Sequence, residues 1–182
     1  MSGRYIALLR GINVGGRNKV LMRDLRSAIE AAGCDAVATY IQSGNVVLES
    51  DWPTDDVEAR LEAALLARFD LPITVVARSH DQLRRIVRDA PDGFGSDPDT
   101  SLCDVIFLKD PLTPEQCVGL VTPRDGVDRI WAGTDVVYFE RLAARRSQSR
   151  LSRIVGTPEY QCMTIRNWRT TSKLLSMADE RD

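Results

Sequence analysis

The sequence predicts an α+β protein in which the order strand–helix–strand–strand–helix–strand occurs twice. Short apolar or β-branched runs, typical of strands, alternate with segments whose apolar residues recur at helical spacing. Stretches rich in glycine and proline separate these elements. The chain has 182 residues, of which 43% are hydrophobic and 27% charged, so it is long enough for one large core or two small ones.

The first half of the chain predicts one complete βαββαβ unit. Gly33 is expected to end the first helix, and Thr54 to cap the second. The expected elements are a strand at 5–9, a helix at 22–32, a hairpin at 37–41 and 46–49, a helix at 54–69 and a strand at 72–76. This order is that of the ferredoxin-like fold.

The second half repeats the topology with negligible residue identity, which indicates a structural duplication. A connecting helix at 81–88 and a loop at 89–100 precede it. The further elements expected are a strand at 103–108, a helix from 113, a hairpin at 129–132 and 136–140, a helix at 147–155, a strand at 160–165 and a helix at 167–177. We therefore predict a first half at 1–78, a connection at 79–100 and a second half with a C-terminal helix at 101–182.

Composition and charge exclude several classes of function. The net charge of −2 argues against an indiscriminate nucleic-acid binder. The four cysteines form no CxxC pair, which favours reduced thiols over a disulfide framework or a metal site. No apolar run is long enough for a signal peptide or a membrane span, so a soluble, cytoplasmic protein without membrane contact is expected. His80 is expected at a helix entry, and the sequence implies no cofactor.

Basic residues gather in two segments of this mildly acidic chain. Residues 1–26 contain six basic residues and one acidic residue, Asp24. Residues 141–173 contain eight basic residues and one acidic residue, Glu159. If the two segments meet in space they form an anion site. The alternative is that the arginines of 141–153 solvate a helix face.

A polar, glycine-rich loop at 10–19 joins the first strand to the first helix. Glycines there permit positive φ and let successive amides point at one anion, while the helix adds its positive end. The loop comes close to the phosphate-loop pattern GxxxxGK(S/T), but it lacks the final lysine and hydroxyl residue, and the strand order differs. The alternative is a long turn that only requires glycine. Its candidate ligand-binding residues are Arg10, Gly11, Asn13, Gly15, Gly16, Arg17 and Lys19.

Two other polar clusters are candidates for the same site. The hairpin turn presents Gln42, Ser43 and Asn45, and the central pairing of the first and third strands should bring it beside the loop. Near the C-terminus, Arg166, Asn167 and Lys173 lie at a helix start, where cations oppose the helix dipole and favour an anionic partner. Turn formation explains the first cluster equally well, and Trp168 in the second suits a core anchor.

The sequence resembles a bacterial family known as domain of unknown function 1697. The matching segments are 7–16 (ALLRGINVGG), 40–46 (YIQSGNV) and 164–168 (TIRNW), with Thr170, Lys173 and Leu174. The resemblance implies two βαββαβ halves and a bacterial origin, and it implies no activity, cofactor or catalytic residue. Leu21 departs from the family's usual proline, and Arg150 from its usual lysine after serine.

The function remains open among four classes. We favour binding of an anionic, phosphate-bearing small molecule by the loop at 10–19. A nucleic-acid-binding module is less favoured, because Tyr5 is the only aromatic on the two central strands. An enzyme acting on an anionic substrate is the third class, but no carboxylate pair, metal cluster or catalytic triad can be assembled, so no catalytic residue is named. A dimerising structural domain is a further alternative.

Overall fold

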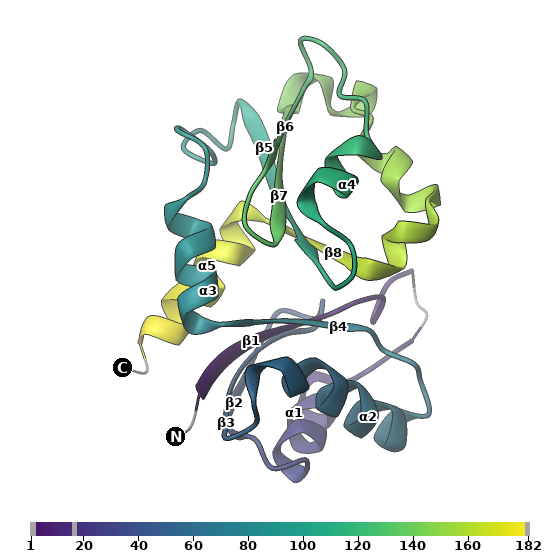
Figure 1. The fold of residues 1–182 in the computed structure, drawn as a ribbon, viewed down its shortest axis with the longest axis vertical. Helices are drawn as coiled ribbons and strands as arrows, with labels where there is room; N and C mark the ends of the chain where they lie inside the picture. The colour runs from purple at the N-terminus through teal and green to yellow at the C-terminus, as the bar shows by residue number, and fades with distance from the viewer. Residues whose placement is uncertain (1–2, 16–17, 181–182) are drawn as a thin grey trace. The chain divides into compact units, whose positions relative to one another are not determined.

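The protein is a mixed α/β chain with two four-stranded antiparallel sheets (Figure 1). The computed structural model describes residues 3–15 and 18–180. The chain divides into two compact units: the first holds residues 1–84 and 174–182, and the second holds residues 85–173. No helix among the described residues has the length and apolar character needed to cross a membrane.

The first unit has the strand order β2-β3-β1-β4. Its elements are β1 (Gly3–Leu9), α1 (Met22–Ala31), β2 (Asp35–Tyr40), β3 (Asn45–Ser50), the 3-10 helix η1 (Thr54–Asp56), α2 (Val57–Phe69), β4 (Val75–Ser79) and the start of α3 (His80–Arg88). Gly33, at φ 96°, follows the end of α1 as predicted. His80 begins α3, which agrees with its predicted position at a helix entry.

Two predictions for this unit were wrong in detail. Thr54 does not cap α2: it begins η1, and its hydroxyl lies 3.2 Å from that of Tyr5. The fourth strand begins three residues later than the predicted 72, because Thr74 contributes only its carbonyl, which accepts a hydrogen bond from Arg10 N at 2.8 Å.

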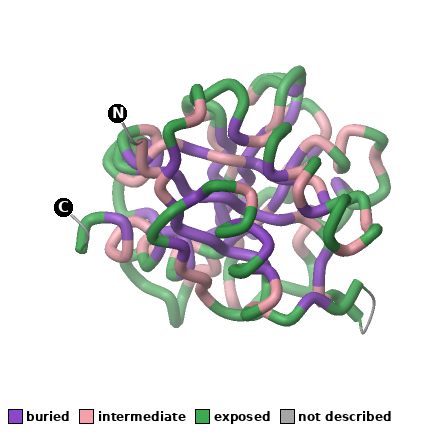
Figure 2. The backbone as a smooth tube through the Cα atoms, turned by 90° about the horizontal axis from the view of Figure 1, so that it is seen from below, coloured by how far each residue is buried: buried purple, intermediate pink, exposed green. Residues whose placement is uncertain are grey.

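The core of the first unit lies between its sheet and its two helices, which cover the same face (Figure 1). The central strands β1 and β3 are antiparallel, with Ala7 opposite Val46. Leu25 of α1 and Leu61 and Leu65 of α2 are fully buried against them. Burial of each such leucine contributes roughly 1.5–3 kcal/mol. Figure 2 colours the backbone by burial, and buried segments alternate along it with exposed ones.

The outer strand β4 makes a second set of contacts with α2. Glu62 Oε1 accepts a hydrogen bond from Val75 N at 2.8 Å, and Glu58 Oε1 accepts one from Ala77 N at 2.8 Å. Both amides belong to residues of the strand that pairs with β1 on its other side. The helix is thus tied to the edge of the sheet by polar contacts as well as by apolar packing.

The second unit has the strand order β6-β7-β5-β8. After the end of α3, its elements are β5 (Ser101–Leu108), α4 (Pro114–Gly119), β6 (Asp128–Ala132), β7 (Val136–Leu142), the 3-10 helices η2 (Ala143–Gln148), η3 (Leu151–Gly156) and η4 (Pro158–Cys162), β8 (Met163–Asn167) and the start of α5 (Trp168–Asp179). Thr113 caps α4 through a capping box with Gln116.

The helix predicted at 147–155 is not an α-helix. Two 3-10 helices occupy this region, and Ser149 between them has extended backbone at φ −62° and ψ 145°. Arg145 also leaves helical geometry, at φ −119° and ψ 18°. The strand predicted at 160–165 is shifted to β8, because η4 takes its first residues.

An aromatic cluster organises part of the second unit. The ring of Phe94 makes edge-on contacts with Trp131, Tyr138 and Trp168, at centroid distances of 6.2, 5.4 and 5.2 Å. Gly95 lies so close that a Cβ there would fall 2.0 Å from Trp168 Cδ1. These contacts support the interpretation of Trp168 as a packing residue. The four cysteines are free thiols.

The C-terminal end of α5 belongs to the first unit. Arg4 Nη1 donates to the carbonyl of Ala178 at 2.7 Å, and Asp179 Oδ1 lies 2.7 Å from His80 Nε2 and 3.2 Å from Arg84 Nη2. The segment predicted as a connection at 79–100 is therefore divided between the two units after Arg84.

Candidate functional site

The β1–α1 loop (residues 10–21) and the β2–β3 turn (residues 41–44) lie side by side in the first unit. We call them together the loop pair. The sheet brings them together, because Leu8 of β1 lies opposite Asn45 of β3. Leu9 N then donates to the carbonyl of Gly44 at 2.7 Å. The predicted approach of the turn to the start of the loop is confirmed.

Asn13 joins the two parts of the loop pair. Its Nδ2 donates to the carbonyls of Gln42 and Val20, both at 2.9 Å, and its Oδ1 accepts from Val20 N at 2.9 Å. Its φ of 55° lies in the left-handed region, which asparagine tolerates better than most residues. Asn13 therefore fixes the shape of the loop pair, and its amide is engaged within the protein.

Asn18 closes the loop on itself. Asn13 N donates to the carbonyl of Asn18 at 3.1 Å, and Asn18 Nδ2 donates to the carbonyl of Gly11 at 3.0 Å. Gly11 and Gly15 have φ of 74° and 57° and are exposed. Their positive φ allows a compact loop to turn without a side chain in the way. The predicted site residues Gly16 and Arg17 lie outside the described residues.

The turn is held from within by two residues. Gly44 has a φ of 77°, and a Cβ there would fall 2.7 Å from Leu9 Cβ and 2.8 Å from Ile12 Cδ1. Asn45 is fully buried, and its Nδ2 donates to the carbonyl of Tyr40 and to Ser43 Oγ, both at 3.0 Å. Glycine is therefore required for close approach of the turn to the loop, and Asn45 stabilises the turn.

The loop pair carries positive charge and no acid. Residues 10–21 and 41–44 contain Arg10, Arg17 and Lys19 but neither aspartate nor glutamate. Lys19, Gln42 and Ser43 are exposed, and Arg10 is half-buried. The loop pair thus presents cations and polar side chains on a backbone that its own asparagines hold in place.

These motifs lie within a region that matches a known family. The model of "Protein of unknown function (DUF1697)" matches residues 2–138. The chain belongs to the DUF1697 family. No functionally curated protein matches it, and the family's description assigns no activity.

One solved structure resembles this DUF1697 chain over nearly its whole length. The conserved bacterial protein SP0830 from Streptococcus pneumoniae is 25% identical, with 98% of this chain and 99% of that chain covered and a TM-score of 0.86. An unknown protein from Galdieria sulphuraria is 12% identical over 100% of this chain and 94% of that chain, with a TM-score of 0.29.

The three remaining predicted site residues of the DUF1697 chain belong to the second unit. Arg166 of β8 is buried, and its Nη1 donates to Thr164 Oγ1 at 2.7 Å and to the carbonyl of Ile165 at 2.9 Å. Burial lowers its pKa to about 10. Asn167 Oδ1 accepts from Thr170 N at 2.8 Å and so caps α5, whereas Lys173 is exposed.

Arg166 and Asn167 therefore have structural partners within their own unit. Their contribution to a site shared with the loop pair stays a prediction. Within residues 3–15 and 18–180, no group of three or more histidine, cysteine or acidic side chains is arranged to hold a metal ion.

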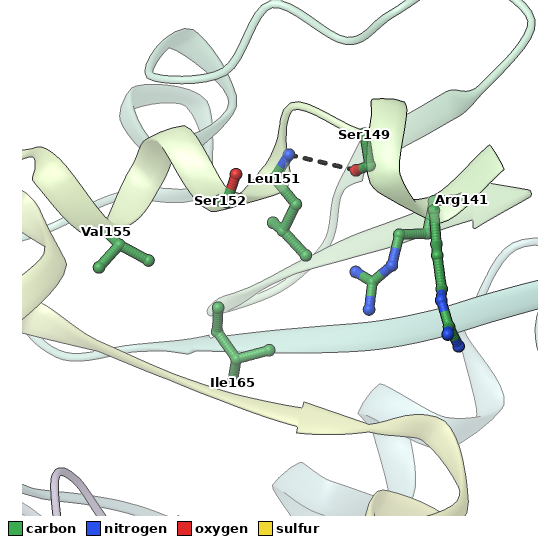
Figure 3. Close-up of a pocket in the computed structure, with 7 residues that line it drawn as sticks. Arg141, Ser149, Leu151, Ser152, Val155 and Ile165 are labelled. Atoms are coloured by element: carbon green, nitrogen blue, oxygen red, sulfur yellow. Dashed lines mark hydrogen bonds between the residues drawn. The ribbon is translucent and has the colours of Figure 1, made fainter. Parts of the chain in front are cut away.

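A cavity in the second unit was missed by the sequence analysis (Figure 3). Its volume is about 370 Å³, and it is lined by Arg141, Arg146, Ser149, Leu151, Ser152, Val155 and Ile165. The apolar pattern of residues 147–155 predicts a continuous helix there. The break at Ser149 between two short helices creates the concave wall, and periodicity gives no signal for such a break.

Proposed function

We propose that the first unit binds a phosphate-bearing small molecule at the loop pair. The carrying observation is the hydrogen bond from Asn13 Nδ2 to the carbonyl of Gln42, which joins the cationic loop to the polar turn. The proposed site residues are Arg10, Gly11, Asn13, Gly15, Gly16, Arg17, Lys19, Gln42, Ser43 and Asn45.

Charge and preorganisation support this proposal. Three cations without an acid in either segment raise the local concentration of anions. The asparagine contacts hold the loop before any ligand arrives, which lowers the ordering cost of binding. Arg10 and Lys19 then supply charge-assisted hydrogen bonds to phosphate oxygens, and the exposed backbone at Gly11 and Gly15 supplies amides.

The side chains of the turn have different roles. Gln42 and Ser43 are exposed and offer an amide and a hydroxyl to the ligand. Asn13 and Asn45 do not contact the ligand, but their hydrogen bonds hold the loop and the turn in the positions that bind it. Arg166, Asn167 and Lys173 belong to the second unit and are not part of this proposal.

We also propose that both units are ferredoxin-like. Read from the last strand, the orders are β4-β1-β3-β2 and β8-β5-β7-β6, so the two units share one topology. In the second unit, 3-10 helices replace the α-helix between the third and fourth strands. A duplication in which one helix has been shortened accounts for both units.

An NMR titration of the full chain tests the binding proposal. Inorganic phosphate and glucose 6-phosphate are expected to shift the amide resonances of residues 11–19 and 42–45 saturably. Arg10→Gln and Lys19→Gln should each weaken binding about tenfold, which corresponds to the loss of about 1.4 kcal/mol. Arg26→Gln is the matched control, because Arg26 is an exposed cation of α1 that pairs with Glu30 at 2.7 Å. Shifts confined to other segments, or equal weakening by the control, would contradict the proposal.

Nucleic-acid binding of the aromatic-stacking type finds less support. Tyr5, the aromatic on the central strands of the first unit, is 5% exposed, and its hydroxyl donates to the carbonyl of Trp52 at 3.2 Å. A ring held in this way is not available to stack on a base. Steeply salt-dependent binding to a random oligonucleotide would nevertheless favour this class.

A further inference from the structure

The cavity in the second unit has one polar and one apolar wall. Figure 3 shows Arg141, Ser149 and Ser152 on elements that surround the same hollow as Val155 and Ile165. Its volume of about 370 Å³ falls within the range of roughly 300–1,000 Å³ that is usual for small-molecule sites.

The polar wall is cationic. Arg141 Nη1 donates to Asp104 Oδ2 at 2.7 Å, which fixes the position of this guanidinium. Arg146 makes no side-chain hydrogen bond or ion pair with any residue that the structure describes, so its charge is uncompensated there. Residues 141–153 contain five arginines and no acid, so this segment carries positive charge beyond the ion pair of Arg141 with Asp104.

Two serines add hydrogen-bonding capacity to this wall. Ser149 Oγ accepts a hydrogen bond from Leu151 N at 3.3 Å (Figure 3), so its own proton is still available to a ligand. The side chain of Ser152 is exposed and has no hydrogen-bond partner within the described part of the chain. Two hydroxyls beside two guanidiniums suit the oxygens of a phosphate or a carboxylate.

The apolar wall comes from three aliphatic side chains. Leu151 is buried, Ile165 is partly buried, and Val155 is 54% exposed although it is a large hydrophobic residue. An inorganic ion would leave this wall in contact with water. A ligand with an apolar group beside its charged group would cover it and gain about 25 cal/mol for each Å² removed from water.

We infer that this cavity is a second ligand site of the protein, for a small organic anion in which a phosphate or carboxylate is attached to an apolar group. The anionic group lies against Arg146 and the two serines. The apolar group lies on Val155 and Ile165. The site is built entirely within the second unit and is independent of the loop pair.

Calorimetry and amide chemical shifts of the full chain, with phenyl phosphate as the probe, test this inference. Phenyl phosphate is expected to bind more tightly than inorganic phosphate or phenol, with shifts centred on residues 146–155. Benzoate in place of phenyl phosphate separates a preference for carboxylate from a preference for phosphate.

Two variants test the two walls separately. Arg146→Gln should weaken binding of phenyl phosphate at least about tenfold. Arg153→Gln removes the same charge from the same segment, but Arg153 does not line the cavity. This substitution should therefore change the affinity for phenyl phosphate less than about threefold. Val155→Ser should weaken binding of phenyl phosphate and leave that of inorganic phosphate unchanged.

Three results would overturn the inference. The first is that neither phenyl phosphate nor benzoate binds saturably at millimolar concentration. The second is that Arg146→Gln and Arg153→Gln weaken the binding of phenyl phosphate equally. The third is that the amide chemical shifts change only at residues outside the cavity. Loss of phosphate binding at the loop pair would leave this site unaffected, so the two proposals fail independently.

Discussion

Arg78 and Arg166 occupy equivalent positions in the two units. Each is buried and is the penultimate residue of the last strand of its unit, β4 or β8. In each, Nη1 donates a hydrogen bond to the carbonyl of the preceding residue, at 2.6 Å for Arg78 and 2.9 Å for Arg166. Each is followed by one polar residue, Ser79 or Asn167, whose side chain accepts a hydrogen bond from the first turn of the next helix. The two units thus correspond at the level of individual side chains.

Replacing the buried guanidinium of Arg166 should destabilise the second unit. Arg166→Met leaves Thr164 Oγ1 and the carbonyl of Ile165 without their donor, which costs about 1–3 kcal/mol. Urea unfolding followed by tryptophan fluorescence in a Trp52→Phe background measures this, because Trp131 and Trp168 then report on the second unit. Arg169→Met, an exposed change on α5, should stay within about 0.5 kcal/mol. An Arg166→Met protein as stable as the parent would contradict the expectation.

Gly44→Ala should be one of the most destabilising alanine substitutions in the first unit. The added Cβ meets Leu9 and Ile12 at less than 3 Å, and the positive φ adds about 1–2 kcal/mol of strain. Gly11→Ala is the matched control, since its φ is also positive but nothing lies within 4 Å of the new Cβ. We expect Gly11→Ala to show the strain alone, and Gly44→Ala at least twice that loss in thermal or urea unfolding. Equal losses would show that the turn can move away from the loop.

Asn13 variants should separate the conformation of the loop from its hydrogen bonds. Asn13→Gly keeps the positive φ and removes three hydrogen bonds, so the amide of Val20 should exchange faster with solvent deuterium. Asn13→Ala adds strain to the same loss and should exchange faster still. Unchanged protection of Val20 in both variants would mean that the loop does not depend on Asn13.

Tyr138 should make the second unit less stable in alkaline solution. Burial, and secondarily the charge of Asp89, raises the pKa of Tyr138 to about 12. The folded state then holds a proton that the unfolded state, with a pKa near 10, has lost, so stability falls as pH rises from about 10 to about 12.

Tyr138→Phe removes this dependence. It also removes the 2.7 Å hydrogen bond from Tyr138 to the carbonyl of Ile86, so at pH 7 it should be about 1 kcal/mol less stable than the parent. The deficit should shrink between pH 10 and pH 12 in urea unfolding. A constant deficit over that range would show that Tyr138 does not titrate as expected.

Sequence patterns predicted the fold well where one physical cause dominates. Apolar periodicity placed α1 and β1, and Gly33 marked the end of α1, because local geometry alone requires a glycine there. The strand β4 was placed three residues too early, because its register depends on pairing with Leu9. Such pairing across the sheet leaves no local signal.

The candidate site shows the same limit. The meeting of the loop with the turn follows from the strand order and was predicted. The hydrogen bonds of Asn13 and Asn45 to backbone carbonyls were not predicted. The sequence does not indicate which polar side chains bind a ligand and which bind the backbone. The cavity beside Ser149 escaped prediction because it depends on a break in a helix that periodicity indicated as continuous.

The two glutamates of α2 that bind the backbone of β4 occupy the outer edge of the first sheet, where another chain could otherwise pair. An outer strand with unused amides is a template on which another chain can add a strand, the first step of many aggregates. Glu58 and Glu62 occupy the amides of Ala77 and Val75, and they place carboxylates where an incoming strand would have to align. Replacing both glutamates by alanine would free these two amides and remove the charge at this border of the sheet, which would leave it open to intermolecular β-pairing.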